Sequence, residues 1–275
     1  VHDGPGVRTV VFFKGCNLHC RWCHNPESIH KEKEILLYPD RCIGCGACVK
    51  QCPAGAHSFT EGGHRIDRNK CIHCFRCCEE CYADALVCVG EETDTETVMD
   101  EIRRNKGYFD HSGGGVTFSG GECMLQTEPL LELLKSCRKE GIHTAVDTAG
   151  NVPWSSLEEV LPWTDLFLYD IKAFDPKVHK ACTGVTNERI LENFRSLADR
   201  GAAVTVRIPY VPELNGTQLE GIASFLSGYP QIRAELLPYH SMGNSKYHAL
   251  EETFFAGTAP DKKAVEQLKK KYHFY

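Results

Sequence analysis

The sequence predicts an α/β fold in which six parallel strands form a partial barrel and a small cysteine-rich domain is inserted after the first strand. From about residue 93 onward, strand-like and helix-like segments alternate, which is typical of a parallel sheet with crossover helices. A closed barrel of this kind needs eight strands, so we expect a (β/α)6 barrel that is open along one side. Residues 30–90 interrupt the alternation with short apolar runs, many cysteines and frequent Gly and Pro. We therefore assign residues 1–29 and 91–275 to the barrel and residues 30–90 to the insert.

Each element of the barrel is predicted from its local sequence. The expected strands are short, mainly apolar runs at 7–13, 115–119, 143–148, 166–172, 203–211 and 233–239. The expected helices lie at 95–109, 129–141, 155–161, 187–201, 217–228 and 261–272. A Thr/Asp cluster opens the helix that begins at Thr95, and Gly141 ends the helix that begins at Pro129. Because strands and helices alternate, the strands should run parallel, with their carboxyl ends at one edge of the sheet.

Composition and charge narrow the class of protein. The chain has 275 residues, of which 42% are hydrophobic, enough for one large α/β domain with a small insert. Its formal net charge of −6 argues against a nucleic-acid binder that depends on phosphate contacts. The sequence has no apolar run long enough to span a bilayer and no signal-peptide pattern, so we expect a cytoplasmic protein that does not bind membranes. The chain starts almost directly on a strand, which favours a short segment preceding Val1.

The cysteines also indicate a reducing environment. There are sixteen, and eleven of them fall into three tight groups, which a disulfide scaffold would not require. A reduced, oxygen-poor cytoplasm fits better, because exposed iron–sulfur clusters and thiolates are oxidised in air. Four cysteines without any partner spacing receive no functional role: Cys88, Cys123, Cys137 and Cys182.

The most informative group is the C-x3-C-x2-C run formed by Cys16, Cys20 and Cys23, directly behind the first strand. Three thiolates can hold three irons of a [4Fe–4S] cluster, which leaves the fourth iron open to bind a reactive ligand. The alternatives are a redox-active CxxC pair and a zinc site in which His24 supplies a fourth ligand. Because zinc ligands often come as two separated pairs, the spacing favours the cluster.

Two further cysteine groups lie in the insert, and both have the bacterial ferredoxin spacing C-x2-C-x2-C-x3-C. In two-cluster ferredoxins the fourth cysteine of each run ligates the other cluster. The predicted ligand sets are therefore Cys42, Cys45 and Cys48 with Cys81, and Cys71, Cys74 and Cys77 with Cys52. Pro53 follows the first run, whereas Tyr82 stands at the equivalent place in the second, and Cys78 competes with Cys77 as a ligand. Zinc knuckles are the alternative for these cysteines.

A set of polar residues and glycines lies at the carboxyl ends of the predicted strands, where parallel α/β folds build their sites. In chain order the set is Gly120, Gly121, Glu122, Asp147, Asp170, Lys172, Arg207 and His240. Its members taken singly have plainer explanations, such as a tight turn for Gly-Gly-Glu, a salt bridge for Asp170 and Lys172, or a structural role for His240. Together they indicate a zwitterionic, ribose-bearing ligand that lies across the mouth of the barrel.

Several longer stretches resemble a known family. HDGPGVRTVVFFKGCNLHCRWCHNPES, the ferredoxin-type insert, SGGE, DTAG, YDIK, VRIPYVPELN and LLPYHSMGNSKY together resemble the glycyl radical enzyme activating enzymes of the radical S-adenosylmethionine (radical SAM) superfamily. The resemblance covers nearly the whole chain, and the insert is similar to that of the longer, three-cluster branch. It implies a partial (β/α)6 barrel of the radical SAM type with an inserted ferredoxin-like domain that holds two [4Fe–4S] clusters.

The resemblance also implies an activity and its residues. A radical SAM activase reductively cleaves S-adenosylmethionine and uses the 5′-deoxyadenosyl radical to generate a glycyl radical on a partner glycyl radical enzyme. The implied cofactors are S-adenosylmethionine and three [4Fe–4S] clusters, and no side chain is expected to act as a catalyst beyond the SAM-bound cluster. The residues implied are Cys16, Cys20 and Cys23 as cluster ligands, Trp22 and His24 beside the cofactor, Gly120, Gly121, Glu122 and Asp147 near the methionine amino group, Lys172 and Arg207 at its carboxylate, and Asp170 and His240 on the ribose side.

We expect a glycyl radical enzyme as protein substrate, flavodoxin or ferredoxin as electron donor, and a monomer. The chain ends within about forty residues of the sixth strand, so the sequence offers no substrate domain, and a partner loop would enter through the open side of the barrel. One alternative is a radical SAM enzyme that acts on a small molecule or peptide, which would carry an auxiliary domain after the barrel. The other is a ferredoxin-like electron carrier, which leaves the three-cysteine loop unexplained. Which glycyl radical enzyme is activated stays open at this stage.

Overall fold

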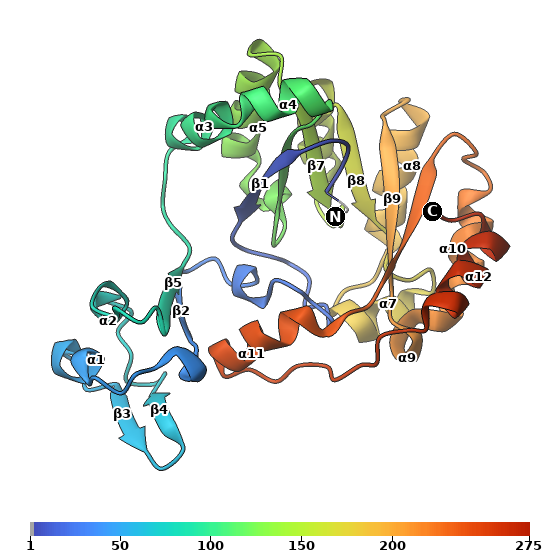
Figure 1. Cartoon of the computed structure of the whole chain (residues 1–275). Coiled ribbons are helices and arrows are strands. Elements are labelled where there is room, and N and C mark those ends of the chain that lie inside the picture. Colours follow the sequence, from blue (N-terminus) through green and yellow to red (C-terminus); the bar gives the residue numbers. More distant parts are fainter. Residues whose placement is uncertain (1–2) are drawn as a thin grey trace.

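The computed structural model describes residues 3–275 and has one sheet of six parallel strands with helices packed around it (Figure 1). The strands, in spatial order, are β1 (Arg8–Phe13), β6 (Gly115–Gly120), β7 (His143–Thr148), β8 (Leu166–Asp170), β9 (Val204–Tyr210) and β10 (Arg233–Pro238). Within residues 3–275 no pairing joins β1 to β10, so the barrel is open between these two edges and the predicted partial barrel is confirmed. The expectation about the start of the chain concerns residues outside this range, as does His2 of the quoted motif.

The helices follow the strands largely as predicted. They are α3 (Thr95–Arg104), α4 (Lys106–Ser112), α5 (Thr127–Lys139), α6 (Trp154–Val160), α7 (Pro176–Thr183), α8 (Glu188–Asp199), α9 (Pro212–Asn215), α10 (Leu219–Leu226), α11 (Asn244–Leu250) and α12 (Lys262–Tyr272). Short 3-10 helices also lie along the chain at η1 (Pro26–Ser28), η2 (Pro39–Arg41), η3 (Cys123–Gln126), η4 (Leu161–Trp163), η5 (Gly216–Gln218) and η6 (Ser241–Gly243). No helix in the described part of the chain is both long and apolar enough to cross a membrane.

The prediction of one helix over 95–109 is wrong, because the chain forms α3 and α4 with a break at Asn105. This residue has φ −98° and ψ 0°, and its side chain donates to the Glu101 carbonyl at 3.1 Å. Such a side-chain contact competes with the helical backbone pattern, which is why Asn often ends a helix. The helices α7, α9 and α11 were not predicted. Asp175 caps α7 by accepting from the backbone N–H groups of Lys177 and Val178.

The main core lies between the sheet and its surrounding helices, and the alternation of strand residues explains it. Val116 and Phe118 on β6 are fully buried in this core, whereas Thr117 and Ser119 between and after them point to the other face. The same period of two places Val206 and Ile208 of β9 in the core. Each such side chain contributes about 1.5–3 kcal/mol by burial. The face left over is the inside of the barrel, where the polar residues lie.

The insert forms a separate lobe beside the barrel (Figure 1). Its elements are α1 (Ala47–Gln51), α2 (Arg76–Glu79), the antiparallel pair β2 (Glu34–Leu37) with β5 (Leu86–Val89), and the antiparallel pair β3 (His57–Thr60) with β4 (Gly63–Ile66). Leu36 packs against Ala249 and Leu250 of α11. Arg68 donates to the carbonyls of Ile35 at 2.7 Å and Ala249 at 3.2 Å. These contacts fix the insert against α11 of the barrel.

Candidate active site

A cavity of about 560 Å³ opens at the carboxyl ends of the strands. The structure describes all thirteen barrel residues that the sequence assigned to S-adenosylmethionine and its cluster. Twelve of them line this cavity: Cys16, Cys20, Trp22, Cys23, His24, Gly120, Gly121, Asp147, Asp170, Lys172, Arg207 and His240. Glu122 is the exception among the thirteen. Residues from five strand ends and from the loop after β1 therefore meet at one place, as parallel strands require.

The loop after β1 presents its three cysteines to the cavity. Backbone bonds hold it in place, from Gly15 N to Ser28 O at 2.9 Å and from Cys23 N to Cys20 O at 3.0 Å. Burial raises the pKa of Cys20 to about 12 and that of Cys23 to about 11, partly opposed by the nearby Lys172 ammonium. Free thiols in this setting would stay protonated at neutral pH, whereas a bound metal deprotonates its cysteine ligands. Three half-buried cysteines with raised thiol pKa values on one loop therefore fit a metal cluster better than a reactive free thiolate.

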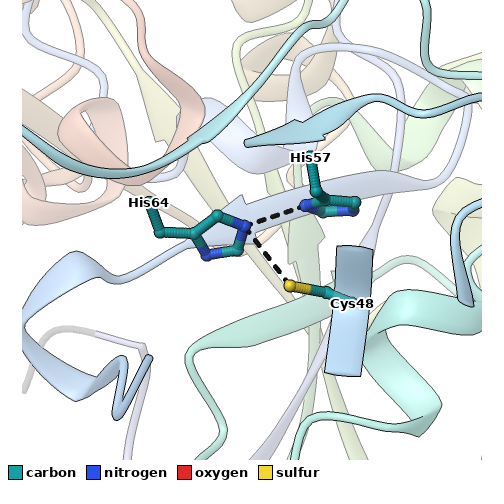
Figure 2. A group of neighbouring side chains, drawn as sticks. All are labelled: Cys48, His57 and His64. Carbon is teal, nitrogen blue, oxygen red and sulfur yellow. Dashed lines mark hydrogen bonds between the residues drawn. The ribbon is translucent and has the colours of Figure 1, made fainter. Parts of the chain in front are cut away.

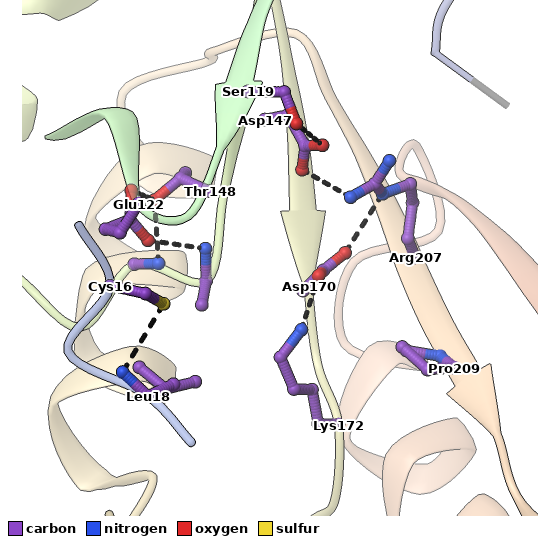
Figure 3. Close-up of polar contacts among 12 residues, drawn as sticks. Cys16, Leu18, Ser119, Glu122, Asp147, Thr148, Asp170, Lys172, Arg207 and Pro209 are labelled. Atoms are coloured by element: carbon purple, nitrogen blue, oxygen red, sulfur yellow. Dashed lines mark hydrogen bonds and ion pairs between the residues drawn. The ribbon is translucent and has the colours of Figure 1, made fainter. Parts of the chain in front are cut away.

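Four charged side chains on β7, β8 and β9 and just after β8 form a compact network inside the barrel (Figure 3). Arg207 donates from Nε to Asp170 Oδ1 at 2.9 Å and from Nη2 to Asp147. Lys172 Nζ donates to the second oxygen of Asp170 at 2.5 Å. Ser119 Oγ donates to Asp147 Oδ2 at 2.6 Å. The salt bridge between Asp170 and Lys172, which was the plainer explanation for these two residues, is thus present as one part of a larger arrangement.

The charges in this network compensate one another. Burial by itself raises the pKa of Asp170, but Arg207 and Lys172 outweigh it, so the pKa ends below its usual value. Burial opposes the charge on Arg207 and Lys172 as well, yet the neighbouring carboxylates raise the pKa of both. Asp147 is different, because burial dominates and raises its pKa despite the Arg207 contact. Two cations and two carboxyl groups therefore stabilise each other in a largely buried site.

The Gly-Gly-Glu turn after β6 has a role that the sequence did not indicate. A Cβ atom on Gly120 would collide with the Phe13 backbone, and one on Gly121 would collide with the carbonyl oxygens of Gly15 and Ser28. Gly121 N donates to Phe13 O at 2.9 Å. Both glycines, which the resemblance placed near the methionine amino group, therefore also let the turn dock on the chain around the cysteine loop.

Glu122 is buried at 1% exposure and faces away from the cavity. Its Oε1 accepts from Thr148 Oγ1 at 2.8 Å and from Met124 N at 3.2 Å, and its Oε2 accepts from Ala149 N at 2.9 Å (Figure 3). Burial raises the pKa of this carboxyl to about 7. In this geometry Glu122 ties the turn after β6 to the loop after β7, and it does not present an oxygen to the cavity.

The histidines at the mouth pair with each other. The rings of His24 and His240 stack with centroids 3.9 Å apart and an interplanar angle of 15°, and His24 Nε2 contacts the carbonyl of His240 at 3.0 Å. His240 Nδ1 is a buried polar atom without a hydrogen-bond partner within residues 3–275. Because buried polar atoms normally find a partner, this atom fits a site that takes a polar ligand. Trp22 is buried against Tyr239 and Val211 beside them.

Sequence reasoning missed several residues that shape the cavity. Ser119 orients Asp147, and Thr148 binds Glu122. Both lie inside the quoted SGGE and DTAG stretches, so their position next to a predicted site residue was the available signal. Phe12 lines the cavity while 55% of its surface is exposed. The exposure of one apolar residue within an apolar strand leaves no trace in the sequence.

In the insert, the four cysteines predicted to hold one cluster lie together. Cys42, Cys45, Cys48 and Cys81 line one small pocket. Three of them come from the first cysteine run and the fourth comes from the second, which is the arrangement found in two-cluster ferredoxins. The predicted ligand Cys77 is buried in the same small apolar core as Cys48, whereas its competitor Cys78 is half-buried at the edge of that core. The neighbouring Cys78 side chain lowers the pKa of Cys77.

The backbone shows that the two cysteine runs are copies of one unit. β4 repeats β2 and β5 repeats β3, each 29 residues later. Left-handed φ values recur at the same spacing: 69°, 71° and 60° at Gly44, Gly46 and Gly55, and 51°, 59° and 50° at His73, Phe75 and Asp84. In this alignment Cys77, and not Cys78, matches Cys48. Residues with a Cβ tolerate such φ values only where their surroundings impose them, so the second loop is held in the same shape as the first.

Comparisons with known proteins agree with this geometry. The model of the radical SAM superfamily matches residues 69–226, and that of the 4Fe-4S dicluster domain matches residues 34–82. The isethionate sulfite-lyase activating enzyme of Desulfovibrio desulfuricans is 41% identical over 96% of this chain and 88% of its own length. The (2S)-3-sulfopropanediol dehydratase activating enzyme of Klebsiella oxytoca is 41% identical over 91% of this chain and 82% of its own. A solved domain of pyruvate-formate lyase-activating enzyme from Bacteroides vulgatus is 32% identical, with a TM-score of 0.50 over 58% of this chain and 96% of that one.

The open six-stranded barrel and its three-cysteine loop, together with the family match, define this chain as a member of the radical SAM superfamily. Within that superfamily it belongs to the activating enzymes of glycyl radical enzymes, in a form that carries a dicluster ferredoxin-type insert. The cofactors of this class are S-adenosylmethionine with a [4Fe–4S] cluster, and its members act on a partner glycyl radical enzyme.

Proposed function

We propose that this activase binds S-adenosylmethionine in the barrel cavity, with its methionine end between the cysteine loop and the charged network. Cys16, Cys20 and Cys23 would hold the cluster, which, when bound, supplies the electron for reductive cleavage of S-adenosylmethionine. Lys172 and Arg207 offer cations to the methionine carboxylate. A zwitterion suits this network because it can replace one internal ion pair by an intermolecular one without leaving a buried charge unpaired.

The other predicted contacts are proposed on the same grounds. Gly120 and Gly121 line the cavity and, with Asp147, would receive the methionine ammonium. Asp170 and the unpartnered Nδ1 of His240 would bind the ribose side. For Glu122 we revise the predicted direct contact to a positioning role, because its oxygens already accept from Thr148, Met124 and Ala149.

The observation that carries the proposal is that this cavity reaches both free edges of the barrel. Phe12 of the edge strand β1 and Leu237 of the edge strand β10 line the same cavity as the three cysteines. A polypeptide loop that enters between β1 and β10 would meet apolar side chains first and the cluster site beyond them. We therefore propose that the hydrogen atom comes from a backbone glycine of a separate protein, delivered as a mobile loop.

We further propose three [4Fe–4S] clusters per chain, with Cys42, Cys45, Cys48 and Cys81 on one auxiliary cluster and Cys52, Cys71, Cys74 and Cys77 on the other. The pocket lined by the first set and the repeat of loop geometry around the second support this assignment. We place the domain limits at residues 30 and 90. A flavodoxin or ferredoxin as electron donor, a monomeric state and a cytoplasmic, oxygen-poor setting complete the proposal; the sixteen cysteines support the last of these.

Two curated relatives of equal identity, 41%, carry the names of different partner enzymes, so the partner is best found by experiment. Anaerobic protein would be incubated with dithionite, S-adenosylmethionine and each candidate glycyl radical enzyme. We expect 5′-deoxyadenosine and a glycyl radical signal by electron paramagnetic resonance (EPR) with the true partner. Deuterium placed at the partner's glycine should appear in 5′-deoxyadenosine. Transfer from a labelled small metabolite instead, with none from any candidate partner, would reject the activase function for this chain.

The proposed S-adenosylmethionine contacts can be tested separately from the partner. Lys172→Met removes a cation from the cavity, and we expect it to raise KM for S-adenosylmethionine at least tenfold in the cleavage assay, roughly the loss of one charge-assisted hydrogen bond. Lys106→Met on the exposed helix α4 is the matched control and should leave KM unchanged. An unchanged KM in Lys172→Met would remove Lys172 from the proposed site.

A further inference from the structure

Two buried histidines lie in the middle of the insert, and nothing described so far gives them a role. His57 on β3 is 6% exposed and His64 on β4 is 4% exposed. Their rings are hydrogen-bonded to each other, from His57 Nδ1 to His64 Nε2, at 2.9 Å (Figure 2). Phe59 stacks on His64 with ring centroids 4.9 Å apart. Buried polar rings are costly unless their nitrogens have partners, so the contacts of this pair decide what it does.

The pair contacts two cysteines of one predicted ligand set. His64 Nε2 lies 3.5 Å from Cys48 Sγ, and His64 Nδ1 lies 3.8 Å from Cys42 Sγ. His57 reaches these cysteines through its hydrogen bond to His64. Cys42 and Cys48 belong to the same proposed auxiliary cluster. The two imidazoles therefore form a continuous polar connection to the ligands of this cluster.

The internal repeat shows that this connection is specific to one half of the insert. Twenty-nine residues after His57 the equivalent position holds Leu86, and 29 residues before His64 it holds Ile35. Both are buried, at 3% exposed. The same backbone positions are thus filled by aliphatic side chains in one copy and by hydrogen-bonding rings in the other. Packing alone does not require histidine here.

We propose that His57 and His64 form a hydrogen-bonded bridge that tunes the reduction potential of the auxiliary cluster assigned to Cys42, Cys45, Cys48 and Cys81, with His64 acting on the Cys42 and Cys48 sulfurs and His57 orienting His64. This inference rests on the proposed assignment of the clusters. N–H donors to ligating sulfur stabilise the more negative, reduced form of a cluster and so raise its potential. The bridge makes this cluster easier to reduce than it would be between aliphatic side chains.

Proton counting decides which sulfur receives the N–H donor of His64. A neutral pair carries two N–H protons, and one of them lies between the rings. When His57 donates this proton, His64 Nδ1–H is free to donate toward Cys42. When His64 donates it from Nε2, the same N–H lies beside Cys48. Each tautomer of the pair therefore offers a donor to a different sulfur of one cluster.

The test uses variants that the repeat itself supplies, His57→Leu and His64→Ile, in the complete, anaerobically reconstituted protein. EPR-monitored redox titration gives the midpoint potentials, and iron analysis gives cluster content. We expect each variant to lower the potential of this auxiliary cluster, so that its reduced-to-oxidised ratio at the wild-type midpoint falls at least tenfold, which is about 59 mV for a one-electron couple. The EPR response of the first cluster to S-adenosylmethionine should not change.

Two controls separate the hydrogen bonds from packing. Phe59→Leu removes the ring stacked on His64 but keeps both imidazoles, and it should leave the potentials unchanged. His64→Gln keeps an N–H donor and should restore most of the shift. If both aliphatic variants lose auxiliary iron while His64→Gln retains it, the N–H donor is needed for cluster binding, which also supports the proposal; loss in His64→Gln as well would reject it.

Two results would overturn the bridge. The first is a full iron content in His57→Leu and His64→Ile with unchanged potentials, which would leave the proposed function intact. The second is a mononuclear zinc ion bound by Cys48, His57 and His64, which lie close enough to share a metal ion. Absence of both auxiliary clusters from the wild-type protein is a different failure, because it would reject the cluster assignment on which the bridge depends.

Discussion

Gly46 and Phe75 adopt the same left-handed backbone conformation, with φ of 71° and 59°, at equivalent points of the two cysteine runs. Each directly precedes the first residue of a short helix, α1 or α2. Glycine adopts this conformation freely, whereas a residue with a Cβ loses roughly 1–2 kcal/mol. Phe75 recovers part of this cost by packing against the buried cysteines of the insert. The second loop therefore keeps the shape of the first through tertiary contacts.

Gly46→Ala should destabilise the insert by about 1 kcal/mol, because the new Cβ meets no other atom within 4 Å but the backbone becomes strained. We expect the apparent melting temperature of the anaerobic holoprotein to fall by about 2–4 °C. Gly107→Ala is the matched control, since Gly107 lies inside helix α4, has no left-handed φ and has equal space around it. That variant should be neutral or stabilising. Equal losses in both variants would contradict the strain argument.

Cysteine variants should separate the roles of the clusters. Cys20→Ala removes one of only three ligands of the first cluster and should abolish S-adenosylmethionine cleavage. Cys74→Ala and Cys77→Ala should each lower the iron content by up to about four per chain and leave measurable cleavage with dithionite. Cys78→Ala should retain the iron, because Cys77 and not Cys78 occupies the position equivalent to Cys48. Iron analysis and 5′-deoxyadenosine formation measure both effects, and loss of iron in Cys78→Ala but not in Cys77→Ala would reverse the assignment.

Arg207 should be essential for the stability of the barrel interior as well as for ligand binding. Arg207→Leu leaves Asp147 and Asp170 buried without their shared cation, and such a change costs about 3–5 kcal/mol. Asp147→Asn in the same chain removes one of the two carboxylates, so the double variant should recover part of the loss. Denaturation of the apoprotein gives the free energy of unfolding of the wild type, the two single variants and the double variant, which together form a double-mutant cycle. Strict additivity of the two substitutions would show that Arg207 and Asp147 do not interact.

Glu122 should give the folded protein a pH dependence of a defined sign. Its pKa is about 7 in the folded state, against an ordinary value of 4.5, because burial disfavours the charged form. The folded state therefore binds the proton more tightly, and stability decreases as pH rises from about 4.5 to about 7, by roughly 3 kcal/mol. Glu122→Gln should lack this component, whereas Glu132→Gln on the exposed face of α5 should retain it. Melting temperatures between pH 5 and pH 8 give the comparison, and a difference from wild type that stays constant with pH would refute it.

The sequence predicted the sheet well because its signals are local. Each strand and the helix that follows it lie within a few tens of residues. Their alternation specifies parallel pairing, and this does not depend on the orientation of individual side chains in the folded protein. The break at Asn105 was missed, since it depends on one side chain turning back to the Glu101 carbonyl. The polar residues at the strand ends were found for a similar reason, as carboxyl ends of parallel strands meet at one edge by geometry alone.

By itself, then, the sequence determined the cysteine groups, the six strands and the place of the site, because metal-ligand spacing and strand order are properties of short, contiguous segments. Tertiary structure alone decided which way the side chains turned. Glu122 was expected in the cavity but binds Thr148 on the next strand, and His57 meets His64 across a hairpin. Those orientations depend on hydrogen-bond partners that come from other strands and loops of the fold. A burial preference or a spacing rule along one segment carries no information about such partners, so only the assembled structure reveals them.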